Sequence, residues 1–266
     1  MRNTSMKRRT FLKVSTIAGG SLLVGCSFSS PKIMSTPQAS EEELGMWVRI
    51  GTNDKITLIL PASEMGQQAH TGQAMLVAEE LEADWNSIQV LHAPYHSEFI
   101  NSAADPRGIQ VTGGSVSIGF FWEKLRQVGA GTREMLTTAA AQQWGVPRSG
   151  CKAENGHIRH SDSGRSLSYG QLASAAARLS PPDDPVLKSL DQFRMIGKSL
   201  PKLHTPARIN GTAQYGIDVR RPGMRFAVVS QSPVFGGQVK SYDEAAAKTV
   251  NGVEAVVPIP NGVAVV

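Results

Sequence analysis

The 266-residue sequence predicts an α+β fold, because stretches with strand character alternate with stretches of helical periodicity along most of the chain. Three observations carry this prediction. Apolar runs at residues 47–50 and 55–60 flank a polar turn, which is typical of a β-hairpin. Apolar side chains recur at helical spacing in residues 68–81 and again in residues 118–139. An apolar run at residues 253–257 is typical of a strand.

Composition divides the chain into five segments. We expect an export signal at 1–26, a linker at 27–45, a first domain at 46–180, a second linker at 181–205 and a second domain at 206–266. Both linkers begin with polar, proline-containing stretches, as solvated connections do. Because the chain stops at Val266 inside an apolar run, we expect the second domain to be incomplete.

The first 26 residues match a twin-arginine export signal. Arg8 and Arg9 precede Phe11 and Leu12, and a short apolar stretch follows them. That stretch is shorter than the ~18 residues of a membrane-spanning helix, so we expect export to the periplasm and no role for the segment in the fold. The segment holds five of the 27 basic residues and no acid, which leaves 22 basic against 22 acidic groups. This balance gives no reason to expect nucleic acid as a partner.

The chain contains two cysteines, Cys26 and Cys151. Residues 23–26 fit a lipoprotein processing box, which would make Cys26 a lipidated N-terminus and the only contact with a membrane. The alternative, a small residue in a cleaved signal, stays open. With one cysteine left in the mature chain, no internal disulfide is expected. Iron–sulfur clusters need about four thiolates each, so any such cluster must belong to a partner subunit.

The first domain is expected to start with the hairpin, followed by a helix at 68–81. The acidic residues within 79–82 lie on the face of this helix opposite to its apolar residues. A strand at 88–92 and a long loop at 93–108 come next. Loops of that length in compact domains are often functional.

The helical pattern at 118–139 fits one long helix or two in series, because Gly129 and Gly131 interrupt it. Residues 144–147 end the helix, and a small strand pair follows around residue 155.

Capping boxes predict two further helices. Ser168 with Gln171 opens one, and Ser241 with Glu244 opens a shorter one in the second domain. Between them, residues 215–230 are expected to form strands.

Two turns rich in small residues, 64–67 and 112–117, each precede a helical segment. Free N–H groups and the positive end of the helix dipole can hold an anion at such a point, and glycine lets a ligand approach the main chain. Glycine before a helix is common, so either turn alone would be weak evidence. Together they suggest a clamp for a phosphorylated or anionic cofactor.

At residues 64–71 and 112–117 the sequence resembles the large, molybdopterin-binding subunit of the xanthine dehydrogenase and aldehyde oxidase family, most closely the isoquinoline 1-oxidoreductase type. The resemblance covers nearly all of 46–266. It implies a molybdopterin-binding-type α/β domain followed by an α/β hammerhead-like domain, here truncated. It also implies a permuted order of modules relative to xanthine dehydrogenase.

The resemblance further implies which residues bind the cofactor, a molybdenum–molybdopterin that carries a cytosine nucleotide in the bacterial family. These residues are Met65, Gly66, Gln67, Gly113, Gly114, Ser115 and Ser117. The family has glycine where this chain has Gln68, and a positive φ at that position would strain the backbone by about 1 kcal/mol. The family's catalytic glutamate lies in a C-terminal stretch that this chain lacks. We therefore expect no catalytic residue here and no turnover by this chain alone.

The function implied is that of the N-terminal portion of a periplasmic molybdenum hydroxylase large subunit. Such an enzyme oxidises N-heteroaromatics or aldehydes with oxygen derived from water. Its expected partners are a small iron–sulfur subunit, the remaining C-terminal part of the large subunit and a small-molecule substrate. The alternatives are an exported non-catalytic binding or scaffold protein, an inactive truncated product, and a nucleotide-binding protein.

The titratable residues near the turns have less specialised interpretations. Glu64 beside the first turn is expected to stabilise the start of the following helix rather than act as a base. Pro94 breaks the helix that would place His92 and His96 on one face, and His157 and His160 lack a cysteine or acid at metal-ligand spacing, so we expect no metal site among these histidines.

Overall fold

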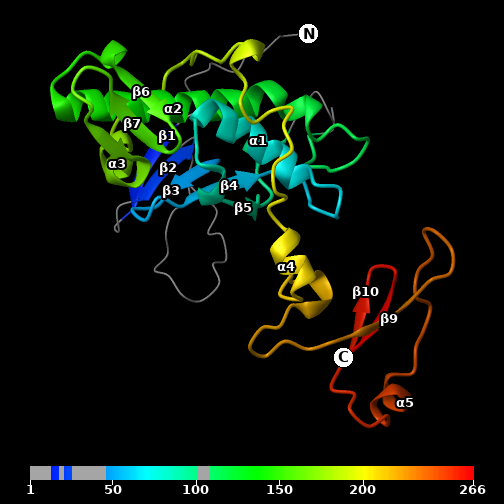
Figure 1. Ribbon diagram of the computed structural model, residues 1–266. Helices are drawn as coiled ribbons and strands as arrows, with labels where there is room; N and C mark the ends of the chain where they lie inside the picture. Colours follow the sequence, from blue (N-terminus) through cyan, green and yellow to red (C-terminus); the bar gives the residue numbers. More distant parts are fainter. Residues whose placement is uncertain (1–12, 18–20, 26–45, 101–107) are drawn as a thin grey trace. The chain divides into compact units, whose positions relative to one another are not determined.

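The computed structural model describes residues 13–17, 21–25, 46–100 and 108–266. The chain forms two compact units, Met1–Asn210 and Gly211–Val266. Helices and strands are mixed in both units, which confirms the predicted mixed class (Figure 1).

The first unit is built on a five-stranded sheet in the order β1-β2-β3-β4-β5. The strands are β1 Lys13–Ile17, β2 Ser21–Gly25, β3 Val48–Ile50, β4 Ile56–Leu60 and β5 Ile88–His92. The predicted hairpin is confirmed, since β3 and β4 pair antiparallel with Val48 opposite Leu58. In contrast, β4 and β5 are parallel, with Ile56 opposite Ile88, and a helix connects them. The first turn follows the end of β4, so this β-α-β connection places it beyond the carboxyl end of β4, where the chain enters α1.

The expectation that the first 26 residues take no part in the fold differs from the structure. Within that segment, β1 and β2 form an antiparallel hairpin, and β2 continues the sheet with Leu22 opposite Ile50 of β3. A short apolar run that cannot span a membrane can still pair with a free strand edge, and β3 offers such an edge. The twin-arginine residues, the 27–45 linker and Cys26 lie outside the described residues.

Three helices of the first unit pack with the sheet around one core. They are α1 Ala69–Leu81, α2 Trp122–Trp144 and α3 Tyr169–Ala176. Figure 1 shows α1 and α2 side by side, and fully buried residues of both join those of β3 and β4, for example Leu81, Leu125, Ile50 and Leu58.

Of the two alternatives for 118–139, the structure has one continuous α2. Gly129 does not break the helix, because its missing side chain admits α1: a Cβ there would lie 2.4 Å from the carbonyl oxygen of Val77. The helix ends where predicted, at Gly145 with φ 65°.

The acidic residues are predicted on the helix face opposite to the apolar residues, and two of them are nevertheless buried. Glu79 and Glu80 are 1% and 0% exposed. Glu79 accepts the N–H groups of Arg194, Met195 and Ile196, at 2.9, 2.6 and 2.9 Å. The buried carboxylates therefore hold a later segment of the chain against α1.

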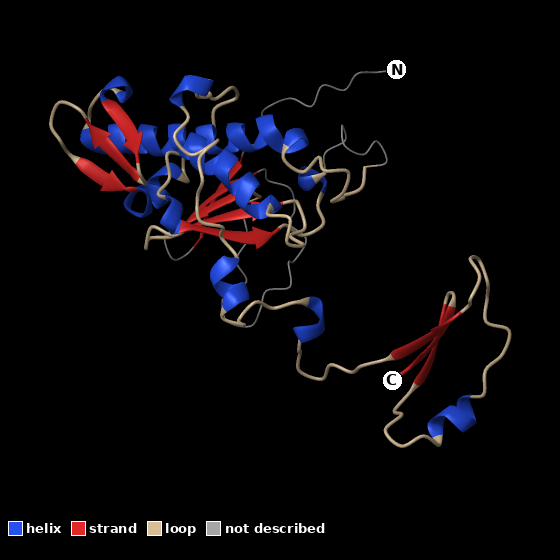
Figure 2. Cartoon of the chain, turned by 45° about the vertical axis from the view of Figure 1, so that its right-hand side comes forward, coloured by secondary structure: helices blue, strands red, loops and turns tan. Residues whose placement is uncertain are grey.

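A second small sheet, visible beside α3 in Figure 2, has the order β6-β7-β8. Its strands are β6 Cys151–Glu154, β7 His157–His160 and β8 Ser166–Ser168. The predicted capping box of α3 is confirmed: the N–H of Ser168 donates to Gln171 Oε1 at 2.9 Å, and the N–H of Gln171 donates to Ser168 Oγ at 3.3 Å.

The remaining elements of the first unit are short. They are α4 Thr205–Ile209 and the single-turn helices η2 Trp85–Ser87, η3 Ser97–Phe99, η4 Gly119–Phe121, η5 Arg148–Gly150 and η6 Leu190–Gln192. The loop predicted at 93–108 contains η3, and its residues 101–107 lie outside the described residues.

The second unit contains an antiparallel sheet in the order β10-β11-β9, a short α-helix and a single-turn helix. Its elements are η7 Gly216–Asp218, β9 Val228–Gln231, α5 Glu244–Lys248, β10 Val256–Ile259 and β11 Gly262–Val265. The strands expected throughout 215–230 reduce to β9. The predicted short helix is present, but its cap is Asp243 rather than Ser241, because the Asp243 carboxylate accepts the N–H of Ala246 at 2.8 Å.

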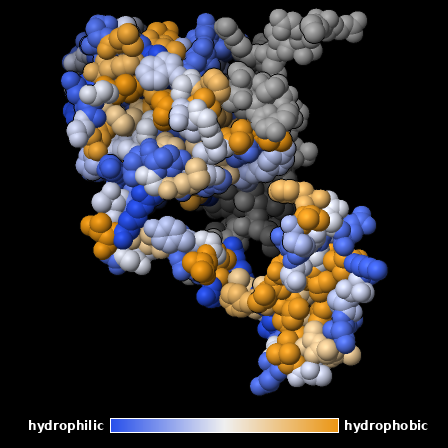
Figure 3. Space-filling view, turned by 90° about the vertical axis from the view of Figure 1, so that its right-hand side faces the viewer, coloured by the Kyte–Doolittle hydropathy of each residue, from blue (hydrophilic) through white to orange (hydrophobic). Residues whose placement is uncertain are grey.

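Hydrophobic side chains are prominent on the surface of the second unit (Figure 3). They include Ile217, Phe226, Val228 and Phe235, all well exposed. Among the described residues, no helix combines the length and apolar character required to cross a bilayer.

Candidate cofactor-binding site

The first turn joins β4 to α1 and presents its predicted binding residues to solvent. Met65, Gly66 and Gln67 are all exposed. Gly66 has φ 105°, a conformation that glycine adopts without steric cost. The side-chain amide of Gln67 folds back into the turn: its Oε1 accepts the N–H of Met65 at 2.6 Å, and its Nε2 donates to the carbonyl of Ser63 at 2.7 Å. This amide therefore shapes the turn, in addition to any contact with a ligand.

Gln68, which replaces the family's glycine, has φ 68° and is the N-cap of α1. The positive φ on which the expected strain depends is therefore present. It costs a residue with a Cβ about 1 kcal/mol.

The carboxylate of Glu64 lies at the N-terminus of α1 and accepts N–H groups there. It accepts the N–H groups of Gly66, Gln68 and His70, at 2.8, 3.1 and 3.1 Å. Burial alone would raise the pKa of Glu64, but these N–H groups and the Arg208 guanidinium lower it to about 2. The expectation that the N–H groups of the first turn and of the helix start are free for an external anion is therefore wrong for Gly66, Gln68 and His70. Glu64 has the structural role that its position predicted.

The second turn precedes α2 but does not lead into it directly, because the single turn of η4 lies between them. Gly114 and Ser115 have φ 63° and 58°, so two successive residues are left-handed. Gly113, Gly114 and Ser115 are exposed, and Ser117 is half-buried. The turn therefore projects from the surface before the chain enters α2.

The two turns lie beside each other, although 49 residues separate them. The N–H of Ser63 donates to Thr112 Oγ1 at 2.8 Å. Gln73 of α1 donates from Nε2 to the carbonyl of Ser117 at 2.9 Å. The convergence that a shared ligand requires is therefore present.

The space in front of the turns is open. A Cβ added at Gly66 or Gly113 would meet no atom of the described residues within 4 Å. The donors at this surface are main-chain N–H groups and the hydroxyls of Ser115 and Ser117, which suit phosphate and other oxygen acceptors. By these criteria, the second turn fits an anionic pterin better than the first, whose helix start is already neutralised by Glu64.

A cluster of histidines that the sequence did not predict lies behind the first turn. His70 is 4% exposed, and its Nδ1 lies 3.0 Å from His204 Nε2. His92 Nε2 lies 3.1 Å from Ser63 Oγ. Burial lowers the pKa of both His70 and His92, and neighbouring histidines lower that of His70 further. The signal was weak in the sequence because 134 residues separate His70 from His204.

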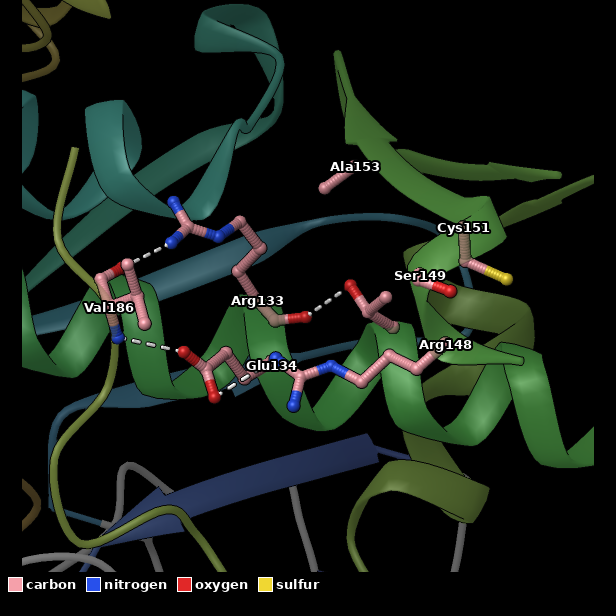
Figure 4. A pocket seen from close by; sticks show the side chains of 8 residues that line it. Arg133, Glu134, Arg148, Ser149, Cys151, Ala153 and Val186 are labelled. Atoms are coloured by element: carbon pink, nitrogen blue, oxygen red, sulfur yellow. Dashed lines mark hydrogen bonds and ion pairs between the residues drawn. The ribbon is translucent and has the colours of Figure 1, made fainter. Parts of the chain in front are cut away.

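A pocket of about 400 Å³ lies elsewhere in the first unit, between α2, β6 and the segment at Val186 (Figure 4). None of the predicted cofactor ligands lines it. Its charged groups are already paired: Glu134 Oε2 lies 3.0 Å from Arg148 Nη2, and Arg133 donates to the carbonyl of Val186 at 2.6 Å. Cys151 in its wall is a free thiol whose pKa is raised by burial, so it stays protonated.

The fold and the paired turns define an α+β domain whose exposed glycine-containing turns suit an anionic cofactor. Residues 7–220 match the molybdopterin cofactor-binding domain family. The chain therefore belongs to this family, which confirms the resemblance found in the sequence to the molybdopterin-binding subunits of the xanthine dehydrogenase and aldehyde oxidase type.

Three curated relatives extend the match. The beta subunit of isoquinoline 1-oxidoreductase from Brevundimonas diminuta is 32% identical over 301 aligned residues, covering 98% of this chain and 38% of the relative. Membrane-bound aldehyde dehydrogenase [pyrroloquinoline-quinone] of Gluconacetobacter polyoxogenes is 31% identical, covering 93% and 32%. A nicotinate dehydrogenase subunit of Pseudomonas putida is 26% identical, covering 87% and 20%. The chain thus spans less than two fifths of the length of each of these relatives.

Proposed function

We propose that this chain holds the molybdopterin cofactor in the large subunit of an exported molybdenum hydroxylase that acts on N-heteroaromatics or aldehydes. The observation that carries the proposal is the convergence of the two turns, through the 2.8 Å hydrogen bond from Ser63 to Thr112. Family membership supports the cofactor class, and two relatives named for isoquinoline and nicotinate support the substrate class. The family match disfavours a cofactor-free scaffold.

The residues of the two turns would hold the cofactor in different ways. Gly113, Gly114 and Ser115 would donate main-chain N–H groups and a hydroxyl to its oxygen atoms, while Gln67 keeps the first turn in shape. Ser117 is fixed by Gln73, so its position is set by the core. The bound molybdenum centre would supply the two-electron oxidation of the substrate, with oxygen from water.

The whole enzyme would also need a partner that accepts the electrons. We propose that electrons leave through a partner subunit with iron–sulfur clusters, because the family resemblance implies such a subunit and Cys151, the one cysteine among the described residues, is buried as a free thiol. The family resemblance supports the cytosine form of the cofactor, while Arg8 with Arg9 supports export to the periplasm and residues 23–26 support a lipid on Cys26.

The proposal is tested by expressing the chain in a host that makes molybdopterin and measuring molybdenum and pterin in the purified protein. Gly113→Leu fills the open space before the second turn at a position without positive φ, so we expect about a tenfold loss of molybdenum. Gly216→Leu is the matched control, since Gly216 is equally open but lies in the second unit. Equal molybdenum in both variants, or none in the parent chain, would contradict the proposal.

The name of one relative contains pyrroloquinoline quinone rather than molybdenum. The same purified chain should therefore be extracted and assayed for this quinone. Recovery of the quinone without molybdenum and pterin would contradict the proposed cofactor. Loss of the quinone in Gly113→Leu would then show that the two turns bind the quinone instead.

A further inference from the structure

The His70–His204 pair lies on the inner side of the first turn and links α1 to the segment before α4. The nitrogen atoms that face each other, His70 Nδ1 and His204 Nε2, are 3.0 Å apart. The second nitrogen of His70, Nε2, lies 2.7 Å from the carbonyl oxygen of Ala62. Neither imidazole is therefore placed by general packing alone.

The contact with Ala62 fixes the tautomer of His70. A carbonyl oxygen only accepts, so Nε2 must carry the proton and Nδ1 must carry a lone pair directed at His204. An imidazole whose far N–H donates to a backbone carbonyl is the usual arrangement of a metal-binding histidine. The neutral imidazole, in this tautomer, is the form that binds metals.

Glu64 brings a permanent negative charge to the same place. One ligand atom from each of Glu64, His70 and His204 can be chosen so that all three lie within 4.8 Å of one another. The Oε1 atom of Glu64 already accepts from Gly66, Gln68 and Arg208, whereas Oε2 accepts from the N–H of His70. Oε2 therefore retains capacity for a further partner.

We propose that Glu64, at the base of the first turn, forms a binding site for a divalent transition-metal ion of the Zn²⁺ class together with His70 and His204. Two imidazoles and a carboxylate are a ligand set that Zn²⁺ accepts, with a fourth position open to water. The donors of a tetrahedral zinc site lie about 3.3 Å apart, so the two histidine nitrogens, 3.0 Å apart, are already close to that spacing, and the carboxylate would move by at most about 1.5 Å. His204 would shift its proton from Nε2 to Nδ1, which needs no net loss of a proton.

Arg208 would compete with the metal ion for the negative charge of Glu64. Its Nη2 atom lies 3.2 Å from Glu64 Oε1 and neutralises the carboxylate when no ion is bound. Removing this guanidinium should therefore strengthen metal binding, whereas a purely structural histidine pair would show no such response.

The site is tested by titrating Co²⁺ and then Zn²⁺ into the full chain produced without molybdate, following the visible absorption of tetrahedral Co²⁺ and the Tm. We expect one Co²⁺ per chain, displaced by Zn²⁺, and a Tm that rises with Zn²⁺. Loss of a residue that only supports a metal ligand typically weakens metal binding by about 10–100-fold. His204→Ala removes a direct ligand, so it should weaken Co²⁺ binding by more than about 100-fold. His157→Ala is the matched control, since His157 lies in β7 and bonds the carbonyl of Asn155.

His204 is the preferred position for the substitution because it is half-buried and lies outside α1, so His204→Ala should fold. Far-UV circular dichroism checks this, and His204→Gln provides a second variant. Arg208→Gln should tighten Co²⁺ binding several-fold. Absence of the absorption, equal affinity in His204→Ala, or an unchanged or weaker affinity in Arg208→Gln would each overturn the site as proposed.

Discussion

Two glutamates near opposite ends of α1 use the same chemistry over very different distances along the chain. Glu64 accepts three N–H groups from residues 66–70 and pairs with Arg208. Glu79 accepts three N–H groups from residues 194–196 and pairs with Lys188. The first carboxylate shapes a local turn that faces solvent. The second attaches a distant segment to the core, so we expect its loss to affect the whole first unit.

The largest effect is therefore expected for Glu79→Gln. Removal of one partner from a buried ion pair typically costs 3–5 kcal/mol, and here Lys188 keeps Glu82 as a second partner, so we expect a loss of about 3 kcal/mol in the free energy of unfolding. Urea denaturation at pH 7 measures it. Glu123→Gln, an exposed glutamate on α2, is the control and should change stability by less than about 0.5 kcal/mol. Similar losses in both variants would show that the buried carboxylate does not hold the segment.

The two glutamates also show what the sequence could predict. A carboxylate just before a helix predicts an N-terminal role, because its N–H partners are neighbours in the chain, and the structure gives Glu64 this role. The burial of Glu79 is not predictable, because nothing in the α1 pattern reveals partners 115 to 117 residues away. The hairpin, α1, β5 and the capping box of α3 were predictable for the same reason as Glu64: local patterns specify them.

The site shows the same division. Each turn could be found from its glycines, and the structure brings the two together through Ser63 and Thr112. The histidine pair could not be found, because His204 lies at the end of the predicted linker and its segment docks on α1 through contacts such as Leu203 N–H to Thr71 Oγ1 at 3.4 Å. The sequence likewise could not show that the Glu64 carboxylate accepts the N–H groups at the start of α1, since this contact depends on the path of the turn.

A smaller effect is expected for Glu64→Gln. The amide oxygen still accepts N–H groups but loses the charge that favours the helix start and Arg208, so we expect a loss of about 1–2 kcal/mol at pH 7. The pKa of Glu64 is lowered to about 2 from an ordinary value of 4.5. Its contribution is therefore complete above pH 4.5 and disappears as the pH falls through about 2.

The difference in unfolding free energy between wild type and Glu64→Gln, measured from pH 7 to pH 2, tests this assignment. Subtraction removes the titration of all other carboxyl groups. We expect the difference to shrink steadily below pH 4.5. A difference that stays constant down to pH 2 would mean that the charge of Glu64 contributes nothing to the turn.

The smallest effect, and the one closest to the cofactor, is expected for Gln68→Gly. With φ 68°, the glutamine carries a strain of about 1 kcal/mol that glycine avoids, although glycine also gains freedom in the unfolded chain, so the net gain in stability should stay below about 1 kcal/mol. If the strain distorts the first turn, molybdenum occupancy of the purified chain should rise with the substitution. Asn155→Gly is the matched control, because Asn155 has φ 47° in the turn between β6 and β7, and asparagine tolerates this conformation. Equal molybdenum occupancy in wild type and Gln68→Gly would show that the left-handed conformation of residue 68 does not affect cofactor binding. Glu64 and Glu79 alone would then account for the difference between the two ends of α1.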